Sequence, residues 1–586
     1  MPREIEVVMD VIGSYVHIFS IIGIFTAIGI VLYLLLKETN KWERLLLGVI
    51  FVSSGLVRFI FGSFAPWRQH DHHIDIFTNL KSNLSETGLF SIGNRYHASG
   101  GLFEMFYDIP LQIIGEFNIY TVYYTSLAIH LLAGLLVFKL ALSLFKKKEV
   151  AFISYLIFAF LPILIEISAS ELIFHINVLT ILLFAVYGLH LFEKIKSGTD
   201  NWHNYIVLLA LFASNLLGRY EYLMIFLGTT IPLFLLLIVT SFDFRKSFFS
   251  NRKMQSFAFF SAILTLFAFF KYLFPSITNP GELSYRLANF TNFNSYLYSF
   301  CYTCYRMPSY GIFLRSFLAP LYFFLALLIT PIFLFKMKRW YIIAVNSFAI
   351  LLLSFLMTDT LTDFRRVMPL LIFIIPQVAY ALYHMLSIGS KINRKKILIL
   401  ASILIILSTY QNKEFLRMET ARKIEQELIL EFVESVPENS LLLTIDNGFD
   451  YRYMQHGNSF DRHLIPSEKD VSIVDIYTEY SSEMLKEYDN IFYYRGLYSY
   501  HESNWNELKK EVGDAYDIIN KERLGPYEVS KKFERNHSLT PLMEETTPNR
   551  LTDTSKVDDY INGNNRTIRT NYRNLRIGFF KINKKS

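Results

Sequence analysis

Long apolar runs separated by short polar stretches make up the first 410 residues of the chain. A transmembrane helix needs about 20 mostly apolar residues, so each run is read as one span. The pattern predicts about twelve spans, at residues 11–36, 45–64, 120–143, 149–168, 172–193, 203–218, 222–241, 255–273, 311–335, 340–357, 367–388 and 397–410. The predicted fold class is therefore an all-α polytopic membrane bundle over residues 1–410.

Lys and Arg gather in every second connection between these spans. Short cytoplasmic loops are rich in Lys and Arg, so the basic connections are predicted to lie inside. They hold Lys37, Lys41 and Arg44; Lys146 to Lys148; Lys194 and Lys196; Arg245 and Lys246; Lys336 and Arg339; and Arg394 to Lys396. This orientation places both termini, the large first loop at 65–119 and the loop at 274–310 outside.

The composition becomes polar and charged after Tyr410, which predicts a separate extracytoplasmic domain over residues 411–586. Alternating or continuous apolar stretches predict strands beginning near Asn439, Asn490 and Leu575. A Ser-capped pattern predicts a helix from Ser503. We expect a small α/β domain in which residues 540–570 form a long loop.

Composition supports a membrane protein. Of the 586 residues, 52% are hydrophobic and only 18% are charged, which is too apolar for an ordinary soluble protein. The net charge of +6 fits the basic inner loops, so no nucleic-acid partner is expected. The two cysteines are too few for a disulfide framework. We expect a multi-pass protein of a bacterial or archaeal inner cell membrane, with its site outside.

The first outer loop opens with "WRQHDHHIDIF", an unusual concentration of polar groups directly after an apolar span. Asp71 and Asp75 are four residues apart and would share one face of a helix, with His70 and His73 beside them. A partly desolvated carboxylate here is suited to act as a general base toward a hydroxyl. Two alternatives stay open: a merely solvated loop, or a zinc or manganese site built from Asp71, His72 and His73.

Three further groups of ionisable residues interrupt apolar sequence. Glu171 opens a helix and either faces the same cavity as Asp71 or only complements the helix dipole. Arg219 in "LLGRYEYL" either binds an anionic phosphate or pairs with the nearby Glu221 in a turn. Arg365 and Arg366 lie at an outer helix end, against the positive-inside trend, so they face either lipid headgroups or a bound anion.

The same outer loop ends in "FYDIPLQIIGEF", just before the next span. This order of features resembles the GT-C class of membrane glycosyltransferases, which includes the protein O-mannosyltransferases and the aminoarabinose transferase of lipid A. Tyr107, Asp108 and Pro110 stand where that class has a Tyr-Pro-Pro-Leu type motif, with one proline missing. The class often has a second acidic residue after the first, and here His72 follows Asp71.

The resemblance implies a function. It makes Asp71 the catalytic base for transfer of a sugar from a polyprenyl phosphate to a glycan, lipid or protein acceptor, with inversion. It implies acceptor and sugar contacts from Asp75, His70, His73, Tyr107, Asp108 and Glu171, and donor-phosphate contacts from Arg219, Arg365 and Arg366. No cofactor is required, although a divalent metal is an alternative.

Other functions fit parts of the same pattern. A lipid-linked glycan polymerase or ligase would share the donor chemistry but usually carries its main loop late in the chain. A transporter would show related halves and charged groups near the middle of its spans, and the sequence indicates neither. A non-catalytic scaffold is the third alternative.

Overall fold

A computed structural model of the chain describes its helices and a sheet. The described ranges are 3–61, 101–115, 119–162, 172–218, 226–231, 249–270, 321–335, 364–387, 393–411, 435–444, 471–476, 483–496, 526–551 and 571–583, with a few single residues between them. The chain divides into two compact units, a helical one that extends to Asn412 and a second formed mainly by Lys413–Ser586.

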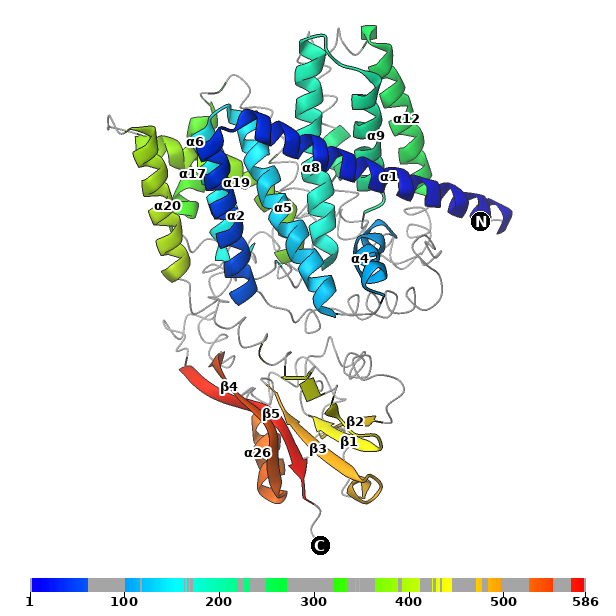
Figure 1. Ribbon diagram of the computed structural model, residues 1–586, viewed down its shortest axis with the longest axis vertical. Helices are drawn as coiled ribbons and strands as arrows, with labels where there is room; N and C mark the ends of the chain where they lie inside the picture. Colours follow the sequence, from blue (N-terminus) through cyan, green and yellow to red (C-terminus); the bar gives the residue numbers. More distant parts are fainter. Residues whose placement is uncertain are drawn as a thin grey trace, which may run out of the picture. The chain divides into compact units, whose positions relative to one another are not determined.

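Helices make up the described part of the first unit (Figure 1). They are α1 (Arg3–Glu38), α2 (Lys41–Phe61), α4 (Gly101–Ile114), α5 (Ile119–Phe145), α6 (Lys148–Phe160), α8 (Leu172–Lys196), α9 (Trp202–Leu216), α12 (Arg252–Ala268), α17 (Leu321–Phe335), α19 (Phe364–Ser387) and α20 (Arg394–Gln411). Apart from α4, each overlaps a predicted span.

Three of the described helices are long and apolar enough to cross a membrane: Tyr15–Glu38, Thr121–Phe145 and His175–Lys196. The chain is therefore an integral membrane protein, whereas the total of twelve spans stays a prediction. The span predicted at 149–168 is interrupted, because α6 ends at Phe160. The first outer loop contains a helix of its own, α4, which the sequence did not predict.

Asparagine caps begin four helices at one end of this unit. Asn40 and Glu43 form a reciprocal capping box at α2, in which each side chain accepts from the other residue's backbone N–H at 3.0 and 2.8 Å. Asn201, Asn251 and Asn393 cap α9, α12 and α20 in the simpler way, by accepting one backbone N–H. The described basic connections that are predicted to be cytoplasmic, at residues 37–44, 146–148, 194–196 and 394–396, lie at this end.

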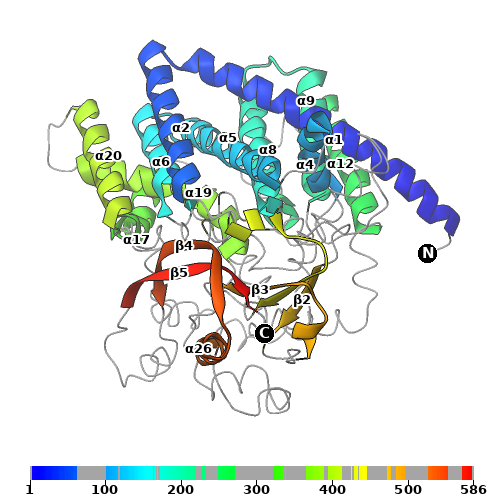
Figure 2. The same cartoon turned by 60° about the horizontal axis from the view of Figure 1, so that its bottom comes forward.

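Helix α6 lies in the interior of the helical unit. Every residue from Val150 to Phe160 is buried, and the helix packs against α5, α19 and α20 (Figures 1 and 2). Gly134 of α5 makes the close approach of α5 to α6 possible, because a Cβ there would lie 2.8 Å from Tyr155 and 2.9 Å from Phe158. A buried helix that is apolar all round is expected to be encircled in this way.

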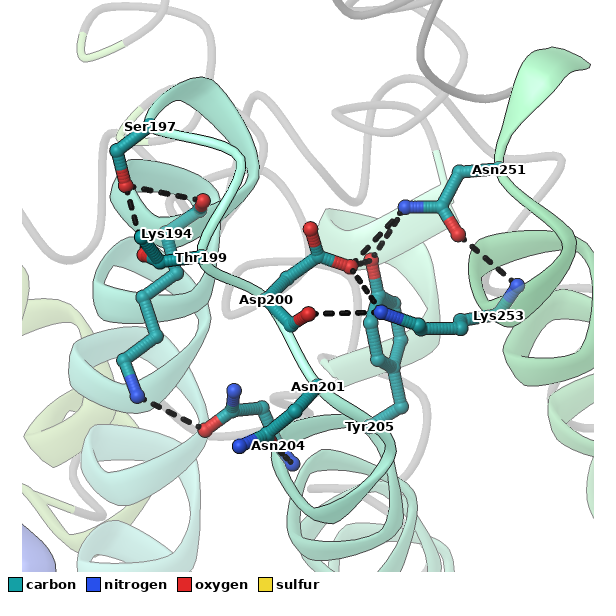
Figure 3. A network of polar contacts seen from close by, with 9 residues as sticks. All are labelled: Lys194, Ser197, Thr199, Asp200, Asn201, Asn204, Tyr205, Asn251 and Lys253. Atoms are coloured by element: carbon teal, nitrogen blue, oxygen red, sulfur yellow. Dashed lines mark hydrogen bonds and ion pairs between the residues drawn. The ribbon is translucent and has the colours of Figure 1, made fainter.

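A polar network fixes the capped ends of α9 and α12 to each other (Figure 3). Asp200 Oδ2 accepts hydrogen bonds from Asn251 Nδ2 at 3.1 Å, Tyr205 Oη at 3.2 Å and Lys253 Nζ at 3.3 Å. Burial acts to raise the pKa of Asp200, but the hydrogen bonds from Asn251 and Lys253 outweigh it and hold the pKa below its ordinary value. The ionised carboxylate is thus the form that this joint stabilises.

The second unit contains a five-stranded sheet in the order β2-β1-β3-β5-β4. Its strands are β1 (Ser440–Thr444), β2 (Val471–Asp475), β3 (Asn490–Arg495), β4 (Leu539–Leu551) and β5 (Asn571–Ile582). Parallel pairing of β1 with β2 and β3 combines with antiparallel pairing of β5 with β3 and β4. Helix α26 (Pro526–Asn536) adds Phe533 to a core formed with Leu443, Ile491, Tyr493 and Phe580.

The structure confirms the strands predicted from Asn439, Asn490 and Leu575. The long loop predicted at 540–570 is wrong in its first part, because β4 occupies it through Leu551. The reason is that β4 pairs with β5 along its length, with a register shift between Pro541 and Met543. Pairing with a neighbouring strand stabilises β4 although its polar sequence does not indicate a strand. The helix predicted from Ser503 lies outside the described residues.

Replacement of Asp200 by Ala tests the joint in Figure 3. We expect the free energy of unfolding to fall by about 1–3 kcal/mol at pH 7, because Lys253 and Tyr205 lose a buried acceptor. The folded-state pKa is depressed, so this contribution is present above about pH 4 and disappears as the pH falls further. Thermal unfolding of the detergent-purified protein measures the difference, which should shrink in acid. Ser197→Ala, in the same turn but exposed, should change stability by less than about 0.5 kcal/mol.

Candidate functional site

The C-terminal end of α6 is buried in the helical unit, so its last backbone carbonyls need hydrogen-bond donors. The last four carbonyls of a helix lack partners within it, and burial without partners is costly. Leu161 leaves the helix with extended backbone, as expected before Pro162, and Leu161, Leu164 and Ile165 beyond the break are buried. Water is therefore not the natural partner for these carbonyls.

Side chains from two other helices satisfy the carbonyls. Leu161 N–H donates to Ile157 O at 2.8 Å, within the last turn itself. Arg58 of α2 donates to Phe158 O at 2.9 Å and to Ala159 O at 2.6 Å. The Thr409 hydroxyl of α20 donates to Phe160 O at 2.6 Å. All four terminal carbonyls thus have a donor, and the Arg58 cation lies at the negative end of the helix dipole.

Arg58 also organises two histidines. Its Nη2 lies 3.2 Å from His130 Nε2 on α5, and His130 Nδ1 lies 3.2 Å from His175 Nδ1 on α8. A guanidinium only donates, so His130 Nε2 is the acceptor and its Nδ1 carries the hydrogen toward His175. Both rings are neutral in this arrangement. All three side chains are buried, and the network joins α2, α5, α6 and α8.

A second polar link runs from α5 to α4, the helix of the first outer loop. Ser126 lies one helical turn from His130 on α5, and its hydroxyl donates to Ser168 O at 3.4 Å. The fully buried Tyr107 of α4 is hydrogen-bonded to Ser126. Packing of Phe106 against Phe25 of α1, with ring centroids 5.8 Å apart, holds the same turn of α4. Helix α4 is therefore anchored on the face of α5 that also carries His130.

Unused polar atoms lie beside this anchor. Asp108 Oδ1 and Gln112 Nε2 are buried and have no hydrogen-bond partner among the described residues. They are one helical turn apart on α4, so an acceptor and a donor share one face of the helix. Burial raises the pKa of Asp108 to about 6. This pair can bind a group that both donates and accepts, such as neighbouring hydroxyls of a sugar.

The structure brings together only some of the predicted site residues. Tyr107 and Asp108 lie at the α4–α5 anchor described above. Arg365 and Arg366 lie in the first turn of α19, and the positions of their side chains are outside the described residues. Asp71, Asp75, His70, His72, His73, Glu171 and Arg219 are outside the described residues altogether.

Sequence reasoning missed Arg58, His130, His175 and Gln112. The available signal was an ionisable residue within an apolar span, as in "SSGLVRFIF" and "SLAIHLLAG", which usually marks pairing or function. Arg58 lies in the last turn of α2 rather than near the middle of a span. Arg58 donates to backbone carbonyls, which cannot take up or release a proton. It therefore has a structural role and does not favour a transporter.

Metal ligands are not assembled in the described part of the chain, where no group of three or more His, Cys, Asp or Glu side chains could hold an ion. The alternative metal site of Asp71, His72 and His73 lies outside that part and stays a prediction.

Neither a family model nor a curated protein matches the sequence. Among solved structures, the chain is similar to the crystal structure of ArnT from Cupriavidus metallidurans in the apo state, with a TM-score of 0.46 and 8% sequence identity. The similarity covers 92% of this chain and 97% of that one.

A pair of arginine variants tests the role of Arg58. Arg58→Met leaves two buried carbonyls without donors, and we expect a loss of about 3–5 kcal/mol in stability and little folded protein. Arg44 makes the same kind of contact at the end of α1, donating to Thr39 O and Leu36 O, but on an exposed surface. Arg44→Met should cost less than about 1 kcal/mol because water replaces the guanidinium. Yield and melting temperature in detergent measure both, and equal losses would contradict the capping role.

Proposed function

We propose that the chain is a membrane glycosyltransferase that moves a sugar from a polyprenyl-phosphate donor to an acceptor hydroxyl at the outer face of the membrane. The observation that carries the proposal is the unused pair on α4, Asp108 and Gln112, which belongs to the motif that resembles the GT-C class. Burying these carboxyl and amide atoms without hydrogen-bond partners costs free energy, unless a ligand supplies the partners. Sugar hydroxyls supply both the donor and the acceptor that the pair lacks.

The loop that begins with Asp71 supplies the base in this proposal. Asp71 takes the proton of the acceptor hydroxyl as its oxygen forms a bond to the anomeric carbon. The bond from that carbon to the phosphate oxygen breaks at the same time, and its electron pair leaves with the polyprenyl phosphate. Attack opposite to the leaving group inverts the configuration. Asp75, His70, His73 and Glu171 are the other proposed contacts to acceptor and sugar.

Negative charge grows on the leaving phosphate during this step. Arg219, Arg365 or Arg366 would stabilise it, because a guanidinium can make two parallel hydrogen bonds to phosphate oxygens. Such contacts accelerate the reaction when they strengthen toward the transition state. Arg58 is not available for this task, since its Nη atoms already donate to carbonyls and to His130.

The predicted position of the site outside the cytoplasm favours a lipid-linked donor. Water-soluble nucleotide sugars are absent there, whereas a carrier anchored in the bilayer can enter a cavity of the protein from the membrane. A lipid-linked glycan polymerase or ligase would use the same donor chemistry, and acceptor identity separates the two.

Sugar transfer in membranes tests the catalytic base. With radiolabelled polyprenyl-phosphate sugars as donors, we expect Asp71→Asn to lower the transfer rate by about 10²–10⁴-fold, the usual worth of a general base. A chelator should leave the wild-type rate unchanged unless His72 and His73 hold a metal. Transfer at the wild-type rate by Asp71→Asn would exclude Asp71 as the base. Arg44→Met, with its exposed substitution, is the control for expression and insertion.

Asp108→Asn separates binding from stability. Burial raises the folded-state pKa above the unfolded value, so ionisation of Asp108 costs stability as the pH rises from about 4 to about 6. The variant should therefore melt no lower than the wild type at pH 7, yet its KM should be about ten-fold higher because a charge-assisted hydrogen bond is lost. The wild-type KM should rise as the pH falls below about 6, and that of the variant should not. Asp200→Asn, at the other end of the helices, is the matched control and should leave KM unchanged.

A further inference from the structure

Three consecutive lysines form the turn between α5 and α6. Lys146 has a left-handed backbone with φ of 54°, an uncommon conformation for a residue with a side chain. The turn sends each lysine to a different helix. Lys146 pairs with Glu193 of α8, and Lys148 Nζ lies 2.8 Å from Glu43 Oε2 of α2. The middle lysine, Lys147, meets α19 instead.

The surroundings of Lys147 are aromatic rather than acidic. Its Nζ lies 4.8 Å from the centre of the Tyr383 ring and 5.7 Å from that of Tyr380. Among the described residues, its ammonium has one hydrogen-bond contact, to His384 Nε2 at 3.4 Å. Cation–π contacts hold such a charge in place but provide no oxygen acceptor. Two of the three ammonium hydrogens thus have no acceptor among the described residues.

The neighbouring charges leave this region positive. Arg394 at the start of α20 lies 3.8 Å from Glu149 Oε1, and its side chain is 79% exposed. Lys395 and Lys396 follow it and are exposed. Partial burial lowers the pKa of Lys147, Glu149 opposes this shift, and Arg394 adds to it. Glu149 thus faces two cations, Lys147 and Arg394.

The joint around Asp200 at the same end of the helices is different. Lys253 there donates to the Asp200 carboxylate and to its backbone carbonyl at 2.7 Å (Figure 3). Its charge is compensated within the chain. Lys147 differs from Lys253 in this respect, since no carboxylate or carbonyl oxygen accepts from its ammonium among the described residues, and an anion would supply that acceptor.

We propose that Lys147 and Arg394 bind the phosphate of an anionic membrane lipid. The ends of membrane-spanning helices lie at the level of the lipid headgroups, so a phospholipid brings its phosphate to this pair of cations. A free anion in solution is not held at that depth.

The basic turn is predicted to be cytoplasmic, so the lipid belongs to the inner leaflet. The site lies at the opposite helix ends from Asp108 and does not depend on the glycosyltransferase proposal.

Thermal unfolding of the full-length protein in neutral detergent tests the site. We titrate phosphatidylglycerol, phosphatidylcholine or inorganic phosphate. Phosphatidylglycerol should raise the melting temperature of the wild type and of Lys146→Gln, and the other two additives should not. Lys147→Gln should need about ten times more phosphatidylglycerol for half of the shift, because one charge-assisted contact is lost. Lys146→Gln is the matched control, since it removes a charge one residue away that already has a carboxylate partner.

Arg394→Gln is the second variant, chosen because the exposed side chain can be replaced without disturbing the fold. It should also weaken the response to phosphatidylglycerol. Equal weakening by Lys146→Gln and Lys147→Gln would show unspecific attraction and overturn the proposal. Stabilisation by inorganic phosphate at the same phosphate concentration would identify a soluble anion as the ligand instead. A full response in both Lys147→Gln and Arg394→Gln would exclude the site.

Discussion

The buried end of α6 is the constraint on which the helical unit depends. In a bilayer no water is available to carbonyls that leave a helix, so a helix can stop inside only where other side chains take over. Arg58 and Thr409 do this from α2 and α20. These hydrogen bonds therefore fix α2, α6 and α20 relative to one another. The free-energy cost of burying the Arg58 cation is reduced at this point, because the helix dipole and the carbonyls both stabilise a positive charge.

The polar groups around the end of α6 are connected to the first outer loop. Both Nη atoms of Arg58 donate within the chain, and His130 is held by Arg58 on one side and His175 on the other. Through Ser126 the same face of α5 anchors α4 by Tyr107. The rigidity of that anchor matters because Asp108 is the next residue. Asp108 Oδ1, which has no hydrogen-bond partner among the described residues, is thus held by a fixed neighbour and can bind a ligand without the chain first having to be ordered.

The sequence predicted the parts of the structure that follow from local patterns. Apolar length predicted the helices that cross the membrane, and continuous apolar stretches predicted β1, β3 and β5. It did not predict β4, whose polar residues are ordered by pairing with β5, because that pairing is a long-range contact. The end of α6 was missed for a similar reason: Pro162 signals a break, but only tertiary structure shows that Arg58 is there to make the break stable. Tyr107 and Asp108 were found through a motif, whereas the unpaired state of Gln112 could be seen only in the folded chain.

Helix α6 carries a cation at both ends, and its dipole acts on them in opposite ways. At the C-terminal end Arg58 is stabilised by the partial negative charge of the carbonyls. At the N-terminal end Lys147 and Lys148 meet the partial positive charge of free N–H groups, which disfavours them. Lys148 is compensated by Glu43, so the electrostatic cost falls on Lys147. Glu149 offsets this cost only in part, because burial and Arg394 act against it. Any anion near Lys147 would therefore add stability, and the predicted inner leaflet provides lipid phosphates at that depth.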